Sequence, residues 1–382
     1  MTPPDRIPVD PALVSAPAHP LAAQMAAHIH TAGGWIGFDD FMAQALYTPG
    51  MGYYTGGATV FGMLPGVSAA TGQAGSDFVT APEMSPLFGE ALARQVAQAL
   101  QATGTDEVWE FGAGTGALAL QMLDALQAMG VALKRYTIVD LSQPLIARQK
   151  ITLQAYANTV QWANALPTQI RGVVVGNEVL DAMPVKLLAR TGGVWHERGV
   201  TCGPPFTWQD RPTALRPPLE VDGVHDYLTE VHPQGEAFVR TLGDRLQAGA
   251  AFLIDYGFPE AEYYHPQRHM GTVMCHRAHQ ADADPLQDVG LKDITAHVNF
   301  TGIAVAAQDA GLEVLGYTNQ AHFLMNCGLV DAMQQSDLPQ RVAAQRLILE
   351  HEMGELFKVI GLTKGLVWAA MGFARGDKTH RL

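Results

Sequence analysis

Residues 108–117, VWEFGAGTGA, restrict the fold of this chain more than any other stretch. Apolar residues lead into Glu110, three glycines then alternate with small residues, and a helical pattern of leucines begins at Leu118. This order is typical of a strand, a tight turn and a helix, which together start a nucleotide-binding α/β unit. Glycines let the backbone approach a ligand closely, and the helix N-terminus offers unpaired N–H groups to that ligand.

The glycine loop alone is compatible with two cofactors. Gly112, Gly114 and Ala117 satisfy the dinucleotide pattern G-x-G-x-x-G/A, and the same stretch fits the E-x-G-x-G-x-G loop of methyltransferases that use S-adenosylmethionine (AdoMet). Glu110 favours AdoMet, because a carboxylate attracts the sulfonium and ammonium groups of AdoMet and repels a pyrophosphate. A glycine-rich turn that binds no ligand is the third interpretation.

Composition indicates a globular, acidic chain. Its 382 residues are 48% hydrophobic and 16% charged, which is compatible with one large domain with insertions or with two domains. The net charge of −13 argues against a nucleic-acid partner, because phosphate contacts require clustered Lys and Arg. No apolar run reaches the roughly 20 residues of a membrane span.

The cysteines and the N-terminal residues indicate the cellular compartment of the protein. Three widely spaced cysteines suggest no disulfide framework, so we expect a reducing compartment. Residues 1–20 are rich in Pro and Ala and lack the apolar core of a signal peptide. We therefore expect a flexible tail at 1–20 and a cytoplasmic protein.

Apolar runs that alternate with helical patterns predict a doubly wound, Rossmann-like α/β sheet of seven strands. Residues 21–104 are expected to form helices and loops before a core at 105–382, which has insertions at about 195–235 and 268–309. The last two strands are expected to form an antiparallel pair. The expected strands are 109–111, 136–140, 160–163, 172–176, 250–254, 312–317 and 365–371.

Polar residues follow most of these strands at their carboxyl ends, where open α/β sheets bind ligands. Asp140 follows the second strand, 26 residues after Gly114, which is the usual position of a carboxylate that accepts ribose hydroxyls. Asn164 follows the third strand, near the expected adenine, and Asn177 and Glu178 follow the fourth. The structural alternative is that these residues are ordinary helix caps.

An acidic group beside the reacting methyl would suit a guanidinium as acceptor. A guanidinium has a pKa above about 12, and a carboxylate holds it through paired hydrogen bonds. Glu178, with Asp181 or Asp255, fits that task. A metal site at 275–279 (CHRAH) is the weaker alternative, because this spacing is not a usual zinc pattern and no CxxC half accompanies it.

Several blocks, in one order over about residues 20–375, resemble the MidA-like family of AdoMet-dependent methyltransferases. The resemblance implies a class I methyltransferase fold with added N-terminal helices and C-terminal insertions. For mitochondrial members it implies symmetric dimethylation of an arginine in a complex I subunit. The blocks are 47–54 (YTPGMGYY), 77–90 (DFVTAPEMSPLFGE), 110–116, 177–185 (NEVLDAMPV), 255–257, 271–276, 293–300 (DITAHVNF), 320–328 (QAHFLMNCG) and 353–359 (MGELFKV).

We therefore expect an AdoMet-dependent methyltransferase that acts on an arginine of a protein. No metal is expected, and a homodimer is compatible with the sequence. The expected cofactor-binding residues are Glu83, Glu110, Gly112, Ala113, Gly114, Gly116, Asp140 and Asn164. The expected catalytic residues on the acceptor side are Asn177, Glu178, Asp255 and His297.

One departure and two alternatives accompany this prediction. Many family members have Asp where Asn299 stands, so the charge of the acceptor side changes if Asn299 touches the substrate. A nicotinamide-dependent oxidoreductase is the first alternative, with Glu110 against it. An assembly factor that binds AdoMet and transfers nothing is the second, with residues 195–218 and 268–309 as partner surfaces.

Overall fold

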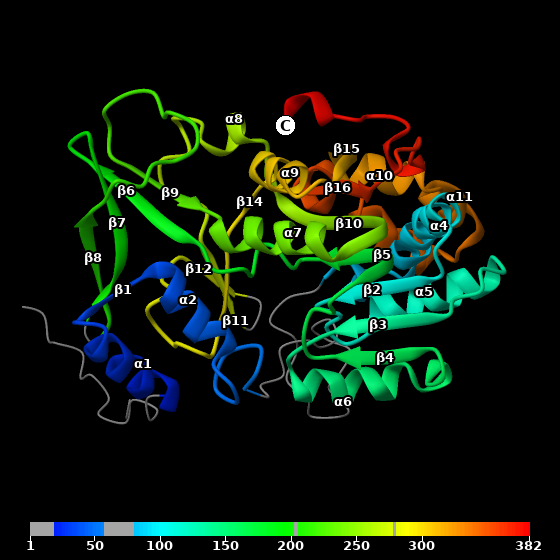
Figure 1. Ribbon diagram of the computed structural model, residues 1–382, viewed down its shortest axis with the longest axis horizontal. Coiled ribbons are helices and arrows are strands. Elements are labelled where there is room, and N and C mark those ends of the chain that lie inside the picture. Colours follow the sequence, from blue (N-terminus) through cyan, green and yellow to red (C-terminus); the bar gives the residue numbers. More distant parts are fainter. Residues whose placement is uncertain (1–18, 57–79, 202–204, 278–279) are drawn as a thin grey trace, which may run out of the picture.

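The computed structural model describes residues 19–56, 80–201, 205–277 and 280–382. The expected tail at 1–20 lies outside the described residues up to residue 18, and Pro20 already begins helix α1 (Pro20–Thr31). A large sheet with helices on both faces lies beside a smaller, more strongly twisted sheet (Figure 1). None of the described helices is long and apolar enough to cross a membrane.

The large sheet has the strand order β15-β16-β10-β5-β2-β3-β4 within the described chain. The strands from β4 to β10 are parallel, whereas β16 runs antiparallel to both β10 and β15. This confirms the predicted doubly wound, Rossmann-like sheet with an antiparallel final pair. Its strands are β2 (Glu107–Phe111), β3 (Arg135–Val139), β4 (Val160–Ala163), β5 (Ile170–Asn177), β10 (Leu246–Phe258), β15 (Glu313–Asn319) and β16 (Phe357–Lys364), and the short β14 (Val298–Asn299) pairs in parallel with the end of β10.

The predicted position of the last strand was wrong: the strand lies in the segment just before the predicted one. Residues 365–370 are irregular, and Leu366 and Val367 are exposed there, whereas β16 at Phe357–Lys364 is buried except at its last residue. Gly361 in the middle of β16 weakens the strand signal in the sequence. The packing requires this glycine, because a Cβ at this position would lie 2.6 Å from the ring of Phe373.

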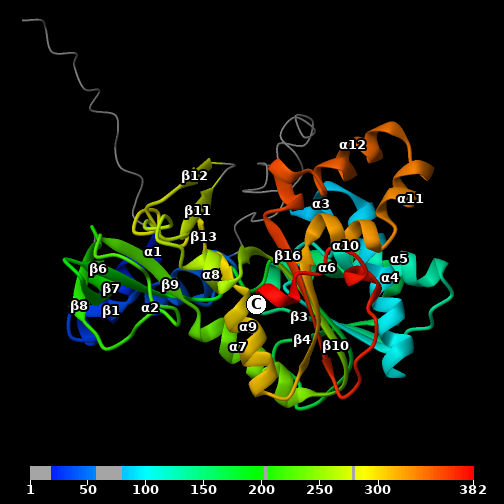
Figure 2. The ribbon, with the colours of Figure 1, turned by 90° about the horizontal axis from the view of Figure 1, so that it is seen from above.

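Helices cover both faces of the large sheet (Figure 2). Helix α6 (Gln143–Thr152) runs beside β4 at its edge (Figure 1). One face packs against α4 (Pro86–Thr103), α5 (Ala117–Ala128), α10 (Gln320–Asn326), α11 (Leu329–Gln335) and α12 (Leu338–Arg346). The other face packs against α7 (Pro233–Arg245) and α9 (Phe300–Asp309).

The register of the parallel strands brings their carboxyl ends to one edge. Phe111 of β2 lies level with Val139 of β3 and Gly176 of β5. Ile254 of β10 lies level with Asn177. Gly112, Asp140, Asn164 and Glu178, which follow β2, β3, β4 and β5, therefore emerge together, and Asp255 lies at the same level within β10.

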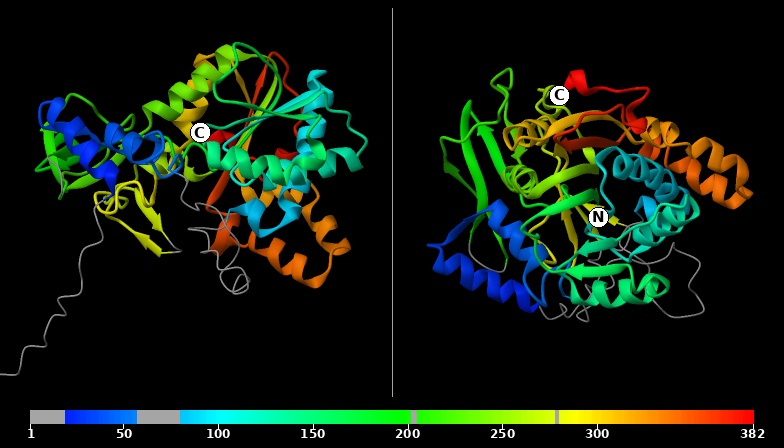
Figure 3. Two further views of the ribbon diagram at one scale, coloured as in Figure 1. Left: turned by 90° about the horizontal axis from the view of Figure 1, so that it is seen from below. Right: turned by 45° about the vertical axis from the view of Figure 1, so that its right-hand side comes forward.

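The smaller sheet joins N-terminal residues to the segment expected as the first insertion (Figure 3). Helices α1 and α2 (Phe38–Tyr47) pack on it around a separate apolar core. Its strands are β1 (Trp35–Gly37), β6 (Lys186–Thr191), β7 (Val194–Thr201), β8 (Thr207–Pro212) and β9 (Tyr227–Val231). The second expected insertion contributes β11 (Met274–Arg277), β12 (Gln280–Asp282) and β13 (Asp293–Thr295), and the short elements are α3 (Ala81–Met84), α8 (Glu260–Tyr263), η1 (Gln154–Tyr156), η2 (Glu350–Gly354), η3 (Met371–Phe373) and η4 (Thr379–Arg381).

Candidate active site

A cavity of ≈ 1020 Å³ opens at the carboxyl edge of the large sheet. Its volume is enough for a nucleoside cofactor together with an acceptor side chain. Most of its wall comes from four parts of the chain: the ends of the core strands, N-terminal residues within 47–55 and 80–84, the segment from Arg268 to His297, and residues within 346–357. Every predicted site residue lines this cavity except Gly116 and Asp255.

The glycine loop has the backbone geometry that its sequence predicts. Gly112, Gly114 and Gly116 have φ angles of 63°, 52° and 85°, which residues with a Cβ adopt only with strain. Gly112, Ala113 and Gly114 face the cavity, whereas Gly116 lies behind the loop and begins α5. The loop therefore presents backbone to the cavity at the N-terminus of a helix.

Glu110 lies beside the loop, almost wholly buried, and its carboxyl group accepts a hydrogen bond of 2.6 Å from the hydroxyl of Tyr136. Burial raises the pKa of Glu110 to about 7, and the hydrogen bond from Tyr136 opposes this rise. A cation in the cavity would favour the ionised form of Glu110. This agrees with its predicted place beside the positive end of AdoMet.

Asp140 follows β3 and faces the cavity with an oriented carboxylate. Its Oδ1 accepts a bond of 2.8 Å from the backbone N–H of Ser142, and its Oδ2 accepts one of 2.8 Å from Gln149. Burial raises the pKa of Asp140, and both hydrogen bonds oppose that rise. Each oxygen keeps a lone pair for a ribose hydroxyl. Asn164 lies beyond β4 on the same wall.

Glu83, in the N-terminal part of the chain, lines the cofactor side of the cavity. It lies in α3, where its carboxylate accepts a hydrogen bond from the hydroxyl of Thr115 in the glycine loop. Gln121 of α5 also donates a bond of 2.8 Å to the carbonyl of Pro82. These contacts hold the segment before α4 against the loop.

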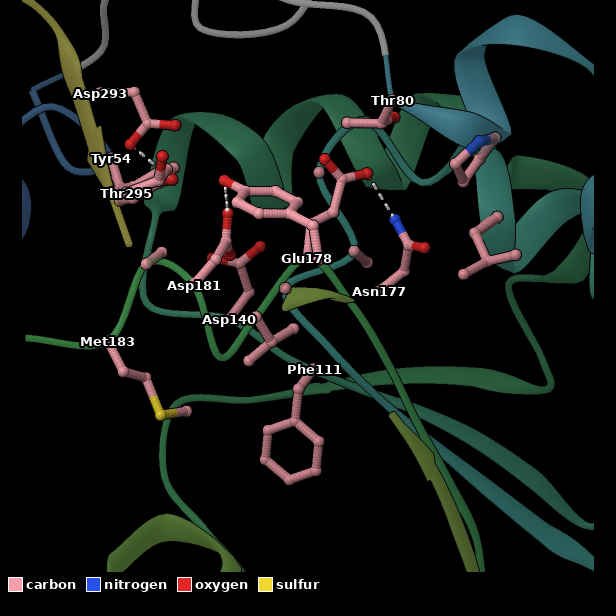
Figure 4. Close-up of a pocket in the computed structure, with 18 of the residues that line it drawn as sticks. Tyr54, Thr80, Phe111, Asp140, Asn177, Glu178, Asp181, Met183, Asp293 and Thr295 are labelled. Atoms are coloured by element: carbon pink, nitrogen blue, oxygen red, sulfur yellow. Dashed lines mark hydrogen bonds between the residues drawn. The ribbon is translucent and has the colours of Figure 1, made fainter. Parts of the chain in front are cut away.

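Glu178 occupies the centre of the acceptor side (Figure 4). Its φ angle of 55° is unusual for a residue with a Cβ and stores roughly 1–2 kcal/mol of strain. Asn177 donates a bond of 2.9 Å to Oε1 of Glu178. Burial and the charge of Asp181 raise the pKa of Glu178 to about 8. Strain and a shifted pKa at a cavity wall are typical of functional residues.

The structure places Asp255 away from the cavity, which corrects the expectation that it lines the acceptor side. Its buried Oδ2 accepts hydrogen bonds of 3.1, 2.9 and 3.2 Å from the backbone N–H groups of Val179, Leu180 and Asp181. Burial and the charges of Asp181 and Glu178 raise its pKa. Asp255 therefore anchors the turn that carries Glu178.

Two acids and three tyrosines complete the acceptor side. Tyr54 donates a bond of 2.8 Å to Oδ1 of Asp293, and its ring stacks on Tyr47 at 5.6 Å (Figure 4). Tyr256 donates a hydrogen bond to Asp181. Sequence reasoning had assigned no role to Tyr54 or Asp293. Their only signal was membership of the family blocks 47–54 and 293–300.

His297 lies against the ring of Tyr256, with ring centroids 5.2 Å apart. Burial and the charges of Arg268 and Lys358 lower its pKa to about 4, so His297 is neutral at pH 7. Asn299 does not line the cavity; it caps α9 by accepting a bond of 3.2 Å from the N–H of Gly302. An Asp at this position would also cap the helix, so the substitution leaves the charge of the cavity wall unchanged.

The geometry does not support the weaker alternative, a metal site at 275–279. Among the described residues, no group of three or more His, Cys, Asp or Glu side chains is arranged to hold a metal ion. Cys275 is buried in the apolar core beneath the smaller sheet. His279 lies outside the described residues.

The strand order with its reversed last strand, the glycine loop and the acid after β3 define a class I AdoMet-dependent methyltransferase. Residues 91–318 match the model of the family Methyltransf_28, S-adenosyl-L-methionine-dependent methyltransferases, and the chain belongs to this family.

Two similar proteins have solved structures, and one of them holds the demethylated form of AdoMet. A crystal structure of a Burkholderia thailandensis protein bound to S-adenosyl-homocysteine has 51% sequence identity, covers 95% of this chain and 96% of that chain, and gives a TM-score of 0.88. A native crystal structure from the same organism has 50% identity and a TM-score of 0.85. The predicted cofactor, AdoMet, is confirmed, and the nicotinamide alternative has no support.

Curated relatives include mitochondrial enzymes. The proteins named protein arginine methyltransferase NDUFAF7 of Danio rerio and Homo sapiens are 28% and 26% identical to this chain. The matches cover 86% of this chain, with 83% and 80% of the relatives.

Proposed function

We propose that this protein transfers the methyl group of AdoMet to a guanidinium nitrogen of an arginine in a protein substrate. One observation carries the proposal: the acceptor side of the cavity gathers Glu178, Asp181 and Asp293 beside the cofactor loop. Among the described residues, neither Glu178 nor Asp181 forms an ion pair with Lys or Arg. A cationic acceptor would supply the missing positive charge.

The acceptor side also has the hydrogen-bonding and aromatic groups that suit a guanidinium. Oδ1 of Asn177 and Oδ1 of Asp181 are buried acceptors without a partner among the described residues. A guanidinium carries five N–H donors in one plane, and an aromatic face can stack on that plane. Tyr54 and Tyr256 both line this wall. The names of the relatives at 26–28% identity also support arginine as the acceptor.

The side chains orient the acceptor and take its proton. AdoMet supplies a methyl group that the sulfonium has already activated. Glu178 and Asp181 hold the guanidinium and direct one terminal nitrogen to the methyl carbon. The nitrogen–carbon bond forms as the sulfur–carbon bond breaks, and sulfur keeps the electron pair as a neutral thioether. The nitrogen then loses a proton to Glu178, whose raised pKa of about 8 makes it a suitable acceptor.

The test is transfer from tritiated AdoMet into protein extract of a strain that lacks this gene, followed by hydrolysis and amino-acid analysis. We expect label in methylated arginine with the wild-type protein. Glu178→Gln should abolish transfer and leave AdoMet affinity within about twofold, because Glu178 contacts the acceptor. Glu236→Gln, on the outer surface of α7, is the matched control and should transfer normally.

Two outcomes would contradict the proposal. Label in lysine or another residue would refute arginine as the acceptor and leave AdoMet as the methyl donor. Binding of AdoMet without transfer to any protein would favour an assembly factor without methyltransferase activity.

A further inference from the structure

Gln149 of α6 lies wholly within the protein, and both its amide nitrogen and its amide oxygen are hydrogen-bonded. Its Nε2 donates bonds of 2.9 Å to the carbonyl of Gly114 and 2.8 Å to Oδ2 of Asp140. Its Oε1 accepts a bond of 2.9 Å from the indole N–H of Trp162. One buried side chain therefore joins segments that follow, or belong to, three adjacent strands.

These three segments are the walls of the cofactor side. Gly114 belongs to the glycine loop after β2, and Asp140 follows β3. Trp162 lies in β4, two residues before Asn164. The loop, the ribose-facing acid and the wall near the expected adenine therefore share one hydrogen-bonded centre. Helix α6 places this centre against the edge of the sheet (Figure 1).

We propose that Gln149 is a positioning residue for the cofactor, which sets the carboxylate of Asp140 and the carbonyl of Gly114 at a fixed separation for AdoMet. Gln149 does not line the cavity, so it acts through its two hydrogen-bonded partners. The inference rests on the proposed contact of Asp140 with ribose and is independent of the methyl acceptor.

The chemistry of the amide explains why glutamine fits this position. Each of its two N–H groups meets an oxygen acceptor, and its carbonyl meets an N–H donor, so no polar group of Gln149 is left without a partner. A leucine of similar size leaves Asp140, Gly114 and Trp162 each without one hydrogen bond. A glutamate puts a second negative charge beside Asp140 and loses both N–H donors.

The test measures binding of S-adenosylhomocysteine by calorimetry, between pH 6 and pH 8, to folded variants. Gln149→Leu should weaken binding by ~10–100-fold, because Asp140 and Gly114, the two partners that line the cavity, each lose a buried hydrogen bond. Gln161→Leu is the matched control. Gln161 of β4 donates a hydrogen bond of 2.9 Å to Thr137 of β3, and neither residue lines the cavity. This control should bind within about twofold of wild type.

Two further variants separate positioning from general support of the fold. Gln149→Glu should bind more tightly as the pH falls from 8 to 6, because a protonated carboxyl regains one donor, whereas the wild type should not. Asp140→Ala combined with Gln149→Leu should lose less affinity than the product of the two single losses, because Gln149 acts in part through Asp140. If Gln149→Leu does not fold, Gln149→Glu and Gln149→Met take its place.

Different outcomes overturn different statements. Binding by Asp140→Ala equal to wild type refutes the ribose contact of Asp140. A loss with Asp140→Ala that simply multiplies with the loss from Gln149→Leu refutes positioning through Asp140. Binding by Gln149→Leu within twofold of wild type refutes the role of Gln149 altogether.

Discussion

Tyr54 donates a hydrogen bond of 2.8 Å to Asp293, and this bond joins positions 239 residues apart in the chain. Tyr54 follows α2, and Asp293 begins β13, so neither belongs to the large sheet. Both face the cavity near Glu178, which follows β5 (Figure 4). The acceptor side is therefore built jointly by the Rossmann-like core and by segments added to it.

Loss of the Asp293 carboxylate should weaken the contact with the methyl acceptor and leave the binding of AdoMet unchanged. Asp293→Asn should lower kcat/KM for methyl transfer by ~10–100-fold, because one charged contact to the cation is lost. Tyr54→Phe should have a smaller effect in the same direction. AdoMet affinity, measured by calorimetry, should stay within about twofold for both.

The control for Asp293 is Asp288→Asn, which removes an exposed carboxyl that pairs with Arg277 and does not line the cavity. Its kinetics should equal those of the wild type. A fall in AdoMet affinity equal to the fall in kcat/KM would place Asp293 on the cofactor side instead.

Asp255→Ala should destabilise the protein. The change leaves the N–H groups of Val179, Leu180 and Asp181 without their acceptor, which should cost about 3 kcal/mol of the free energy of unfolding. Urea denaturation measures this loss. Asp255→Asn keeps one oxygen in place and should lose less. An Asp255→Ala variant as stable as the wild type would show that burying the carboxyl costs as much as its bonds contribute.

AdoMet binding should depend on pH through Glu110. Glu110 has a pKa of about 7 in the protein without AdoMet, and the positive cofactor should lower it. Binding therefore releases a proton below pH 7, so affinity should rise with pH up to about 7 and then level off. Calorimetry in two buffers of different ionisation enthalpy measures the released proton.

Glu110→Gln is the control for this pH dependence. The variant should bind AdoMet more weakly at pH 8 and without proton release. An unchanged slope in Glu110→Gln would assign the titration to another group.

The rate of methyl transfer should follow the ionisation of Glu178. Because burial raises its pKa to about 8, kcat/KM should rise tenfold per pH unit below 8 and level off above it. A steady-state pH profile measures this. His297→Gln should keep the same profile, since the pKa of His297 is about 4. An inflection that disappears in His297→Gln would make the histidine the titrating group.

The sequence was sufficient for the cofactor side because its signals are local. Glu110, Gly112 and Gly114 lie within one strand–turn–helix unit, and Asp140 follows the next strand, so neighbouring residues carry the information. The doubly wound sheet and its antiparallel final pair were also predicted, from the alternation of strand and helix patterns. Gly361 weakened the signal of β16, because the ring of Phe373, close in space, requires the glycine there.

Only the tertiary structure decided which polar groups face the acceptor. Glu178 follows β5 and Asp255 lies at the same level in β10, yet Asp255 turns to three backbone N–H groups and Glu178 turns to the cavity. Asp293 lies at the cavity wall, where it accepts a hydrogen bond from Tyr54, a residue 239 positions earlier in the chain. The direction of a side chain at a strand end depends on packing against residues distant in sequence, and local patterns carry no record of that packing.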